Sequence, residues 1–237
     1  MSRFLVTWRS RTTERTTPVG VLISGGQDFL FSYLPTVAHL EDFRAFVNFP
    51  DLKREYRSSQ LFPFFSQRVM DRRRPDHQAY VAALGLPADA SVIDVLGRAS
   101  GQRKGDTVQV ILEPTVEPDG SVHHAFLLSG TRYAPGDAPS VIDALQQGAD
   151  LTFRPQPENL VNPDAQLICE SHGQALGWVP DALLGFVQEV ITNDYRLTAT
   201  QVNGPEWPNH LRVVAQLRGS VPPGFVPFDS LISLAPA

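Results

Sequence analysis

The sequence predicts an α+β protein with a small mixed sheet-and-helix N-terminal domain, residues 1–114, followed by a small β-barrel domain, residues 122–220. Three observations predict this organisation. Short runs of β-branched and aromatic residues recur along the chain, and segments of helical spacing interrupt them. The segment EPTVEPDGS, at 113–121, has two prolines, a glycine and no apolar periodicity, so it is the predicted linker. A chain of 237 residues is long enough for two such domains.

The first half predicts a small antiparallel sheet followed by helices. Strands are expected at 4–8 (FLVTW), 19–23 (VGVLI) and 28–34 (DFLFSYL). Pro35 is suited to a first helical turn, and Val37, Leu40, Phe43 and Val47 follow it at helical spacing, which predicts a helix there. Further helices are expected at 63–70, 77–84 and 91–96, before a strand at 106–112.

The second half predicts a barrel because six short strand candidates follow one another at close spacing. They are 124–130, 149–153, 165–170, 175–179, 195–202 and 210–217. Two helical pieces interrupt them, at 139–147 and 180–191, and a proline opens each.

The composition is that of a globular chain with two halves of opposite charge. Residues 1–114 hold 15 Lys or Arg and 12 Asp or Glu, a balance of +3, whereas residues 115–237 hold 5 and 13, a balance of −8. Basic surfaces attract phosphate backbones, so the first half suits nucleic acid better than the second. The lone Cys169, the absence of a signal-peptide core in MSRFLVTWRS and the lack of an 18-residue apolar run predict a cytoplasmic protein without a membrane span.

No catalytic or cofactor motif is complete, so we expect a non-enzymatic protein with no cofactor and no metal. GRASGQRKGD, at 97–106, has Gln102 where a P-loop needs its lysine. Cys169 and His172 suggest a thiol–imidazole pair, but no third group is evident to orient the imidazole. Cys169 ends an apolar run and is better interpreted as a buried thiol, which leaves a hydrolase as the least favoured alternative.

A basic cluster in the first half has two interpretations. It comprises Lys53, Arg54, Arg57, Arg68, Arg72, Arg73 and Arg74. The first interpretation is a solvated face that neighbouring carboxylates partly neutralise. The second is a surface for nucleic acid or an acidic partner, to which Arg72, Arg73 and Arg74 would contribute.

The N-terminal half resembles the small N-terminal domain of HipA-type toxin kinases over about residues 3–112. The resemblance lies in the order VTW, VGVL and FSYLP, and then in LFPFFSQRVMDRRRPDHQAYVAALGL. Nothing resembling the kinase domain of that family follows. In split forms of the family the small domain is a separate chain that regulates the kinase. The resemblance therefore implies a bacterial-type regulatory role with a kinase-like protein partner, in a toxin–antitoxin or defence system.

The C-terminal half resembles a HIRAN domain over about residues 123–218, which implies an OB/SH3-like barrel that holds the 3′ end of single-stranded DNA. SGTRY, at 129–133, supplies Arg132 and Tyr133. PQPENLVNPDA, at 155–165, supplies Pro157, Asn159 and Ala165, and LGWVP, at 176–180, supplies Trp178. The sequence departs from the family where Pro155 replaces an arginine, and where Val161 and Asn162 replace a Tyr-Asp pair. Asn162 still accepts a hydrogen bond, although without charge.

Two functions remain open. In the first, the protein binds single-stranded or damaged DNA through Arg132, Tyr133, Asn159, Asn162 and Trp178, together with Arg72, Arg73 and Arg74. In the second, it is purely a protein–protein adaptor that regulates a HipA-type kinase, and the loop 155–165 is only a turn in which Asn159 and Asn162 bond to nearby backbone. The sequence does not specify the strand polarity, the partner's identity or the oligomeric state.

Overall fold

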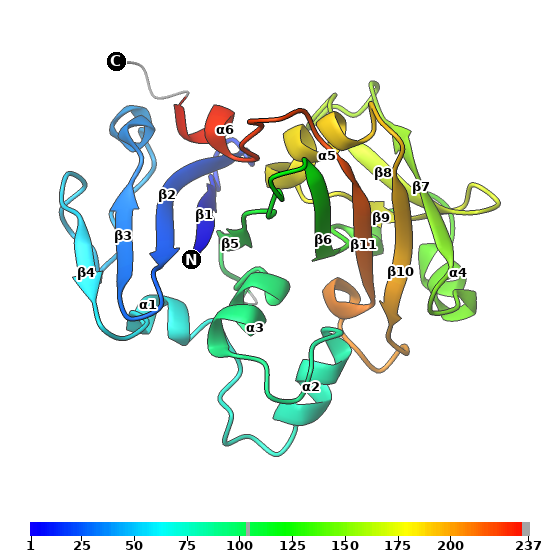
Figure 1. Cartoon of the computed structure of the whole chain (residues 1–237), viewed down its shortest axis with the longest axis horizontal. Coiled ribbons are helices and arrows are strands. Elements are labelled where there is room, and N and C mark those ends of the chain that lie inside the picture. Colours follow the sequence, from blue (N-terminus) through cyan, green and yellow to red (C-terminus); the bar gives the residue numbers. More distant parts are fainter. Residues whose placement is uncertain (103–104, 234–237) are drawn as a thin grey trace. The chain divides into compact units, whose positions relative to one another are not determined.

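The computed structural model describes residues 1–102 and 105–233, and these form two compact units (Figure 1). Unit 1 contains Met1–His77, Ala90–Glu113 and the chain from Phe228 on. Unit 2 contains Gln78–Asp89 and Pro114–Pro227. Each unit has its own antiparallel sheet, so the predicted mixed α+β class is confirmed.

Unit 1 is built on a five-stranded sheet with the order β4-β3-β2-β1-β5 (Figure 1). Its strands are β1 (Ser2–Arg9), β2 (Thr16–Ser24), β3 (Phe29–Tyr33), β4 (Tyr56–Ser58) and β5 (Val108–Leu112). The strands predicted at 4–8, 19–23, 28–34 and 106–112 are therefore present. Strand β4 was not predicted, because it is a three-residue edge strand without an apolar run.

The helices of unit 1 are short. They are the 3-10 helix η1 (Pro35–His39), α1 (Pro63–Ser66), α3 (Val92–Ala99) and α6 (Asp229–Ser233). Helix α2 (His77–Ala83) starts at the end of this unit's first segment and belongs, from Gln78 on, to unit 2. Ser91 and Asp94 form a reciprocal capping box at the start of α3, which explains why this helix begins there.

The helix predicted through Val47 is wrong beyond His39. Val37 and Phe43 are buried as the spacing predicts, but Val47 is 95% exposed. The buried hydroxyl of Tyr33 accepts the Phe46 N–H at 2.7 Å and donates to the Phe49 carbonyl at 3.0 Å. These bonds to β3 replace the helical ones, and the segment packs Phe43, Phe46 and Phe49 inward at intervals of three residues. Desolvation in this position raises the pKa of Tyr33 to about 12.

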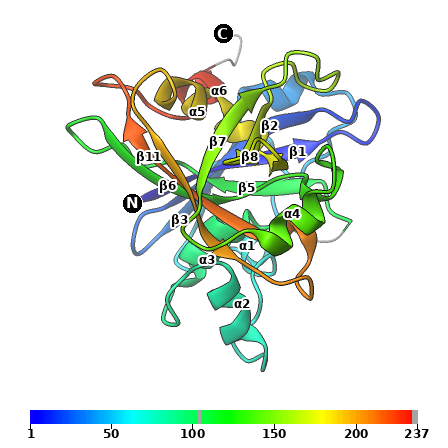
Figure 2. The ribbon, with the colours of Figure 1, turned by 90° about the vertical axis from the view of Figure 1, so that its right-hand side faces the viewer.

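Unit 2 contains a six-stranded antiparallel sheet that curls into a half-barrel, with the order β6-β11-β10-β7-β8-β9 (Figure 2). Its strands are β6 (Ser121–Leu127), β7 (Asp150–Pro155), β8 (Gln166–Glu170), β9 (Ala175–Trp178), β10 (Arg196–Val202) and β11 (Val213–Ser220). The edge strand β9 returns toward the other edge, because Trp178 and Ser129 exchange two backbone hydrogen bonds of 2.8 Å. All six predicted strands are present, although β6 and β11 are displaced by three residues from the predicted ranges.

Both helices predicted in the second half are present in shortened form. They are α4 (Ala138–Ala144) and α5 (Leu184–Val190), and the 3-10 helices η2 (Thr131–Tyr133), η3 (Asp181–Leu183) and η4 (Asn209–Leu211) complete the unit. Figures 1 and 2 both place α5 and α4 toward opposite ends of the curled sheet. Among the described residues, no helix combines the length and the apolar character that a membrane crossing requires.

A buried polar network holds the segment that follows β10. The Asn203 side chain donates to the carbonyls of Ala83, at 2.7 Å, and of Leu211. Arg212, 3% exposed, donates from Nε to the Asn203 carbonyl at 2.8 Å and from Nη2 to Asp143 Oδ1 at 2.5 Å. Because buried polar groups are costly when unpaired, these bonds fix η4 in one position.

Candidate nucleic-acid interface

Arg132 and Tyr133 are exposed next to each other on the 3-10 turn η2. The Tyr133 side chain is 77% exposed, and the Arg132 guanidinium carbon lies 5.9 Å from the centre of the Tyr133 ring. This distance is within the range of a cation–π contact. An accessible aromatic face with a guanidinium beside it can stack a base and pair a phosphate.

The turn that presents these two side chains is anchored on both flanks. Thr131, 4% exposed, donates its hydroxyl to the Asn209 carbonyl of η4 at 2.8 Å. Gly130 has a φ of +61°, and a Cβ there would lie 2.8 Å from the Trp178 ring. Only glycine suits this combination of left-handed backbone and close approach. The turn is therefore held between Trp178 and η4.

Trp178 supports the turn and is itself half-buried. It packs against the small core of Ala134, Ala138, Leu167, Cys169 and Ala175. Its indole Nε1 is buried and has no hydrogen-bond partner in the structure. Trp178 thus packs beneath Gly130, and its predicted contact with nucleic acid stays a prediction.

The loop between β7 and β8 is a self-bonded turn. Asn159 Oδ1 accepts the N–H groups of Val161, at 3.0 Å, and of Asn162, at 3.1 Å. Asn162 Oδ1 in turn accepts the Asp164 N–H at 3.0 Å, and its Nδ2 lies 3.5 Å from Asp181 Oδ1. Both asparagines thus shape the loop, which is the turn interpretation left open by the sequence.

The strand register relates the two predicted segments to each other. Trp178, at the end of β9, pairs with Leu167 of β8 on one side and with Ser129 on the other. The 155–165 loop leads into β8, and the Arg132–Tyr133 turn follows Ser129, so the two segments flank the end of β9. Both segments carry carboxylates: Asp137 follows the Arg132–Tyr133 turn, Glu158 and Asp164 belong to the 155–165 loop, and Asp181 lies beside Asn162 of that loop.

The arginines predicted in unit 1 are largely engaged with their own unit. Arg72 donates to the Ala90 carbonyl at 2.5 Å, and Arg74 forms a two-point ion pair with Asp76 at 2.8 and 2.9 Å. Arg68 is buried against Asp106 at 2.6 Å. Arg73 is exposed, and the structure shows no side-chain bond for it. The ion pair of Arg74 with Asp76 fits the solvated-face interpretation, the buried Arg68 belongs to neither interpretation, and a nucleic-acid contact of Arg72, Arg73 and Arg74 stays a prediction.

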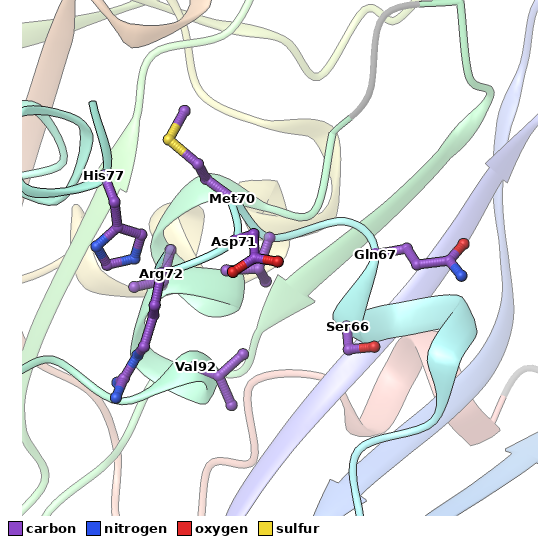
Figure 3. Close-up of a pocket in the computed structure, with 9 residues that line it drawn as sticks. Ser66, Gln67, Met70, Asp71, Arg72, His77 and Val92 are labelled. Carbon is purple, nitrogen blue, oxygen red and sulfur yellow. The ribbon is translucent and has the colours of Figure 1, made fainter. Parts of the chain in front are cut away.

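Arg72 also lines a hollow of 630 Å³ in unit 1 (Figure 3). Asp71, Ser66 and the buried His77 contribute polar groups, and Met70 and Val92 are among its apolar lining residues. Figure 3 shows the Arg72 and Gln67 side chains pointing away from each other. The polar groups do not converge on one point, so the hollow offers no obvious anion site.

The geometry around Cys169 does not form a thiol–imidazole pair. Cys169 is 1% exposed, and desolvation raises its pKa. His172 Nδ1 instead lies 2.8 Å from Glu170 Oε2, and the Glu170 carboxylate also accepts the N–H groups of His172 and Gln174 at 2.8 Å each. These bonds belong to the β8–β9 turn. No group of three or more His, Cys, Asp or Glu within residues 1–102 and 105–233 is placed to hold a metal ion.

The β8–β9 turn should be sensitive to acid, because the Glu170 carboxylate holds it. The backbone N–H bonds from His172 and Gln174 lower its pKa from 4.5 to about 2. A carboxylate with a depressed folded-state pKa stabilises the fold above its unfolded pKa, and the stabilisation disappears as the pH falls through the folded value. We therefore expect the Gln174 amide to be protected above pH 4.5 and to lose protection toward pH 2, as measured by NMR. Glu170→Gln should remove this pH dependence, whereas Glu158→Gln, in the exposed neighbouring loop, should leave it unchanged.

Sequence reasoning missed the residues that position the site. Thr131 and Asn209 are 78 residues apart, and neither carries a motif. Gly130 offered a signal, because a glycine two residues before the Arg-Tyr pair indicates a turn with a special backbone conformation. Val161, 77% exposed, was recognised only as a replacement of a family residue, and the fully exposed Leu160 beside it was not singled out.

Comparison with family models and with curated proteins gives no match. Among solved structures, the HIRAN domain of human HLTF is 12% identical, with a TM-score of 0.31 over 43% of this chain and 76% of that one. A structural-genomics protein from Lactobacillus plantarum is 13% identical, with a TM-score of 0.33 over 44% of this chain and 100% of that one. The structural neighbours thus include a HIRAN domain. Neither match gives evidence of a HipA-type domain, and that resemblance stays a prediction. Matches at these TM-scores leave the function to be argued from the side chains.

Proposed function

We propose that this chain is a non-enzymatic recognition protein that binds a short single-stranded nucleic-acid segment, with a terminal base stacked on Tyr133. The exposed Arg132–Tyr133 pair on a firmly anchored turn is the observation that carries this proposal. Stacking on one aromatic side chain contributes about 1–3 kcal/mol per base. A turn that is already fixed favours affinity further, because its side chains and backbone lose little conformational entropy on binding.

The surrounding charges restrict the ligand to a strand end or a very short segment. Arg132 can pair one phosphate, whereas the carboxylates of Glu158, Asp164 and Asp181 repel a continuing backbone. Unit 2 as a whole holds 5 Lys or Arg and 13 Asp or Glu. A long strand lying along this unit would meet net repulsion. Recognition of only one or two nucleotides avoids this repulsion.

The salt dependence of binding separates this site from a basic surface. For single strands the logarithm of affinity falls with a slope of about −0.7 per phosphate contact. One contact therefore predicts a loss of about two- to threefold between 50 and 200 mM salt, whereas four contacts predict about fiftyfold. Fluorescence anisotropy with a labelled single-stranded oligonucleotide measures this directly. A weak slope supports the Arg132 site, and a steep slope indicates the arginines of unit 1.

A matched pair of double variants tests the residues. Replacing Arg132 and Tyr133 by Ala should weaken oligonucleotide binding about tenfold or more, as expected for the loss of one stacked base and one ion pair. The control replaces Tyr195 and Arg196 by Ala. This pair has the same composition in the same unit, but Tyr195 packs on Phe153 and Arg196 pairs with Asp150. Equal losses in the two double variants would refute the site.

A second candidate function is that of a protein adaptor, and the exposed Leu160 and Val161 favour it. Asn159 holds the turn that presents them, and Glu158 and Asp164 flank them. A basic partner with an apolar recess would fit this loop, and a kinase-like protein of a toxin–antitoxin system is the partner that the HipA resemblance suggests. In this case single-stranded oligonucleotides should not bind, and Leu160→Ser with Val161→Ser should abolish partner binding while Arg132→Ala has no effect.

A further inference from the structure

Unit 1 contains a second hollow, of 780 Å³, that neither candidate function uses. It lies where the β1–β2 turn, the 40–50 segment, α1 and the start of β5 meet. Trp8, Phe46 and Phe64 line it together with Arg11, Arg44 and Arg68. Its volume falls in the range of small-molecule sites, roughly 300–1,000 Å³.

The apolar lining is aromatic and only partly covered. Phe46 and Phe64 are stacked with ring centres 4.5 Å apart and planes 22° from parallel. Trp8 meets Phe43 edge-on at 5.3 Å. All three lining rings are half-buried, so part of each still faces solvent. Such a lining favours a flat aromatic ligand, because offset stacking and edge contacts stabilise ring pairs beyond the area they bury.

The charged lining favours an anion. Three arginines and two aspartates line the hollow, a balance of +1. Asp106 pairs with Arg68 at 2.6 Å, and Asp42 accepts the Ser10 hydroxyl but keeps its charge, so the excess cation comes from Arg11 and Arg44. Arg11 is exposed, and Arg44 uses only Nη1 in the bonds that the structure shows. The guanidiniums of Arg11 and Arg44 thus offer donors in a fork that matches carboxylate and phosphate oxygens.

The walls are fixed before any ligand binds. Arg44 Nη1 donates to the carbonyls of Glu41, at 3.0 Å, and Phe43, at 2.8 Å. The Tyr33 hydroxyl holds the segment at Phe46 and Phe49. The Arg68 guanidinium carbon lies 4.4 Å from the centre of the Phe64 ring. Preorganisation of this kind favours affinity, since side chains need little further ordering on binding.

We propose that this hollow binds a small molecule in which a planar aromatic group carries an anionic group. The ring would insert between Trp8 and the Phe46–Phe64 pair, and the anion would bind the guanidiniums of Arg11 and Arg44. A nucleoside monophosphate and an aromatic carboxylic acid share this chemistry. The site is independent of the Arg132–Tyr133 turn, so either proposal can fail without the other.

The experiment is an NMR titration of the full chain with three probes: anilinonaphthalene sulfonate, adenosine monophosphate and phenylpyruvate. The chain has 3 tryptophans, and a Trp8→Phe variant assigns the indole N–H signal of Trp8 among them. We expect that signal to shift with the sulfonate and with at least one of the other two, which identifies the source. The Trp207 signal should stay unchanged with all three probes, and the Trp178 signal should stay unchanged with phenylpyruvate. A shift of Trp178 alone with adenosine monophosphate would report the Arg132–Tyr133 turn and not this hollow. Uncharged adenosine should bind about tenfold more weakly than its monophosphate, as expected when a charge-assisted hydrogen bond is lost.

Two arginine variants complete the test. Replacing both Arg11 and Arg44 by Ala should weaken binding of the anionic probes about tenfold or more. Arg15→Ala removes a cation from the same β1–β2 turn without touching the hollow, and it should change affinity by less than about twofold. Equal effects of the two changes, equal binding of charged and neutral analogues, or no shift of the Trp8 signal with any probe would overturn the proposal.

Discussion

Replacing Phe31 by Ala should destabilise unit 1 by about 4 kcal/mol, within the range for large aromatic deletions in a core. Phe31 is 0% exposed and contacts five other rings, those of Tyr33, Phe46, Phe49, Tyr56 and Phe65. Gly20 lies directly beneath it, where a Cβ would approach the ring to 2.7 Å. Since the rings pack tightly around one another, the resulting cavity cannot easily collapse.

Phe29→Ala is the matched control for this change. It deletes the same side chain from the same strand, β3, but Phe29 is only half-buried. Its loss should destabilise the unit by about 1–2 kcal/mol, because less apolar area leaves water on folding. Chemical denaturation followed by Trp8 fluorescence, with Trp178 and Trp207 replaced by Phe, reports unit 1 separately. Similar losses for the two variants would show that Phe31 is not the centre of this core.

Replacing Arg212 by Met should destabilise unit 2 by about 3 kcal/mol. Removal of one partner from a buried ion pair usually costs about 3–5 kcal/mol. We expect the lower end because Asp143 keeps 46% of its side chain exposed and can regain water. The carbonyl of Asn203 would remain buried without the Arg212 Nε donor. The same change should weaken nucleic-acid binding, because Arg212 fixes η4, and Asn209 of η4 anchors the Arg132–Tyr133 turn through Thr131.

Arg218→Ala is the control for Arg212. Arg218 is on the same strand, β11, but is exposed, with a 3.4 Å contact to Gln216. Its loss should change stability by less than about 0.5 kcal/mol. A Trp8→Phe background lets tryptophan fluorescence follow unit 2 during denaturation. If Arg212→Met lowers the stability of unit 2 as little as Arg218→Ala does, the buried network does not hold η4.

The sheets of both units were predictable because β-branched and aromatic runs between turn residues report half-buried strands directly. The ends of the strands were harder to predict than their presence. Strand β11 begins at Val213, whereas the pattern suggested 210, because Leu211 is buried as part of η4 and not as part of a strand. The sequence pattern alone does not tell whether a buried apolar residue belongs to a helical turn or to a strand.

The segment after Pro35 shows tertiary structure overriding local pattern. Its apolar residues match a helix, but the Tyr33 hydroxyl and the surrounding rings stabilise an irregular backbone instead. At the candidate site, Arg132 and Tyr133 were visible as residue types. The bond from Thr131 to Asn209 and the contact of Asn162 with Asp181 form only in the folded chain. No sequence motif or residue spacing indicates them.

The most direct test of the central claim is the fluorescence of 2-aminopurine at the 3′ end of a short single-stranded oligonucleotide. Stacking of this base on Tyr133 should change its emission on binding. Tyr133→Phe keeps an aromatic face and should preserve the change, whereas Tyr133→Leu should abolish it and weaken binding. A probe placed in the middle of a longer strand should respond less, because the carboxylates of Glu158, Asp164 and Asp181 disfavour a continuing backbone. An unaltered emission change in Tyr133→Leu, at equal saturation, would contradict the account.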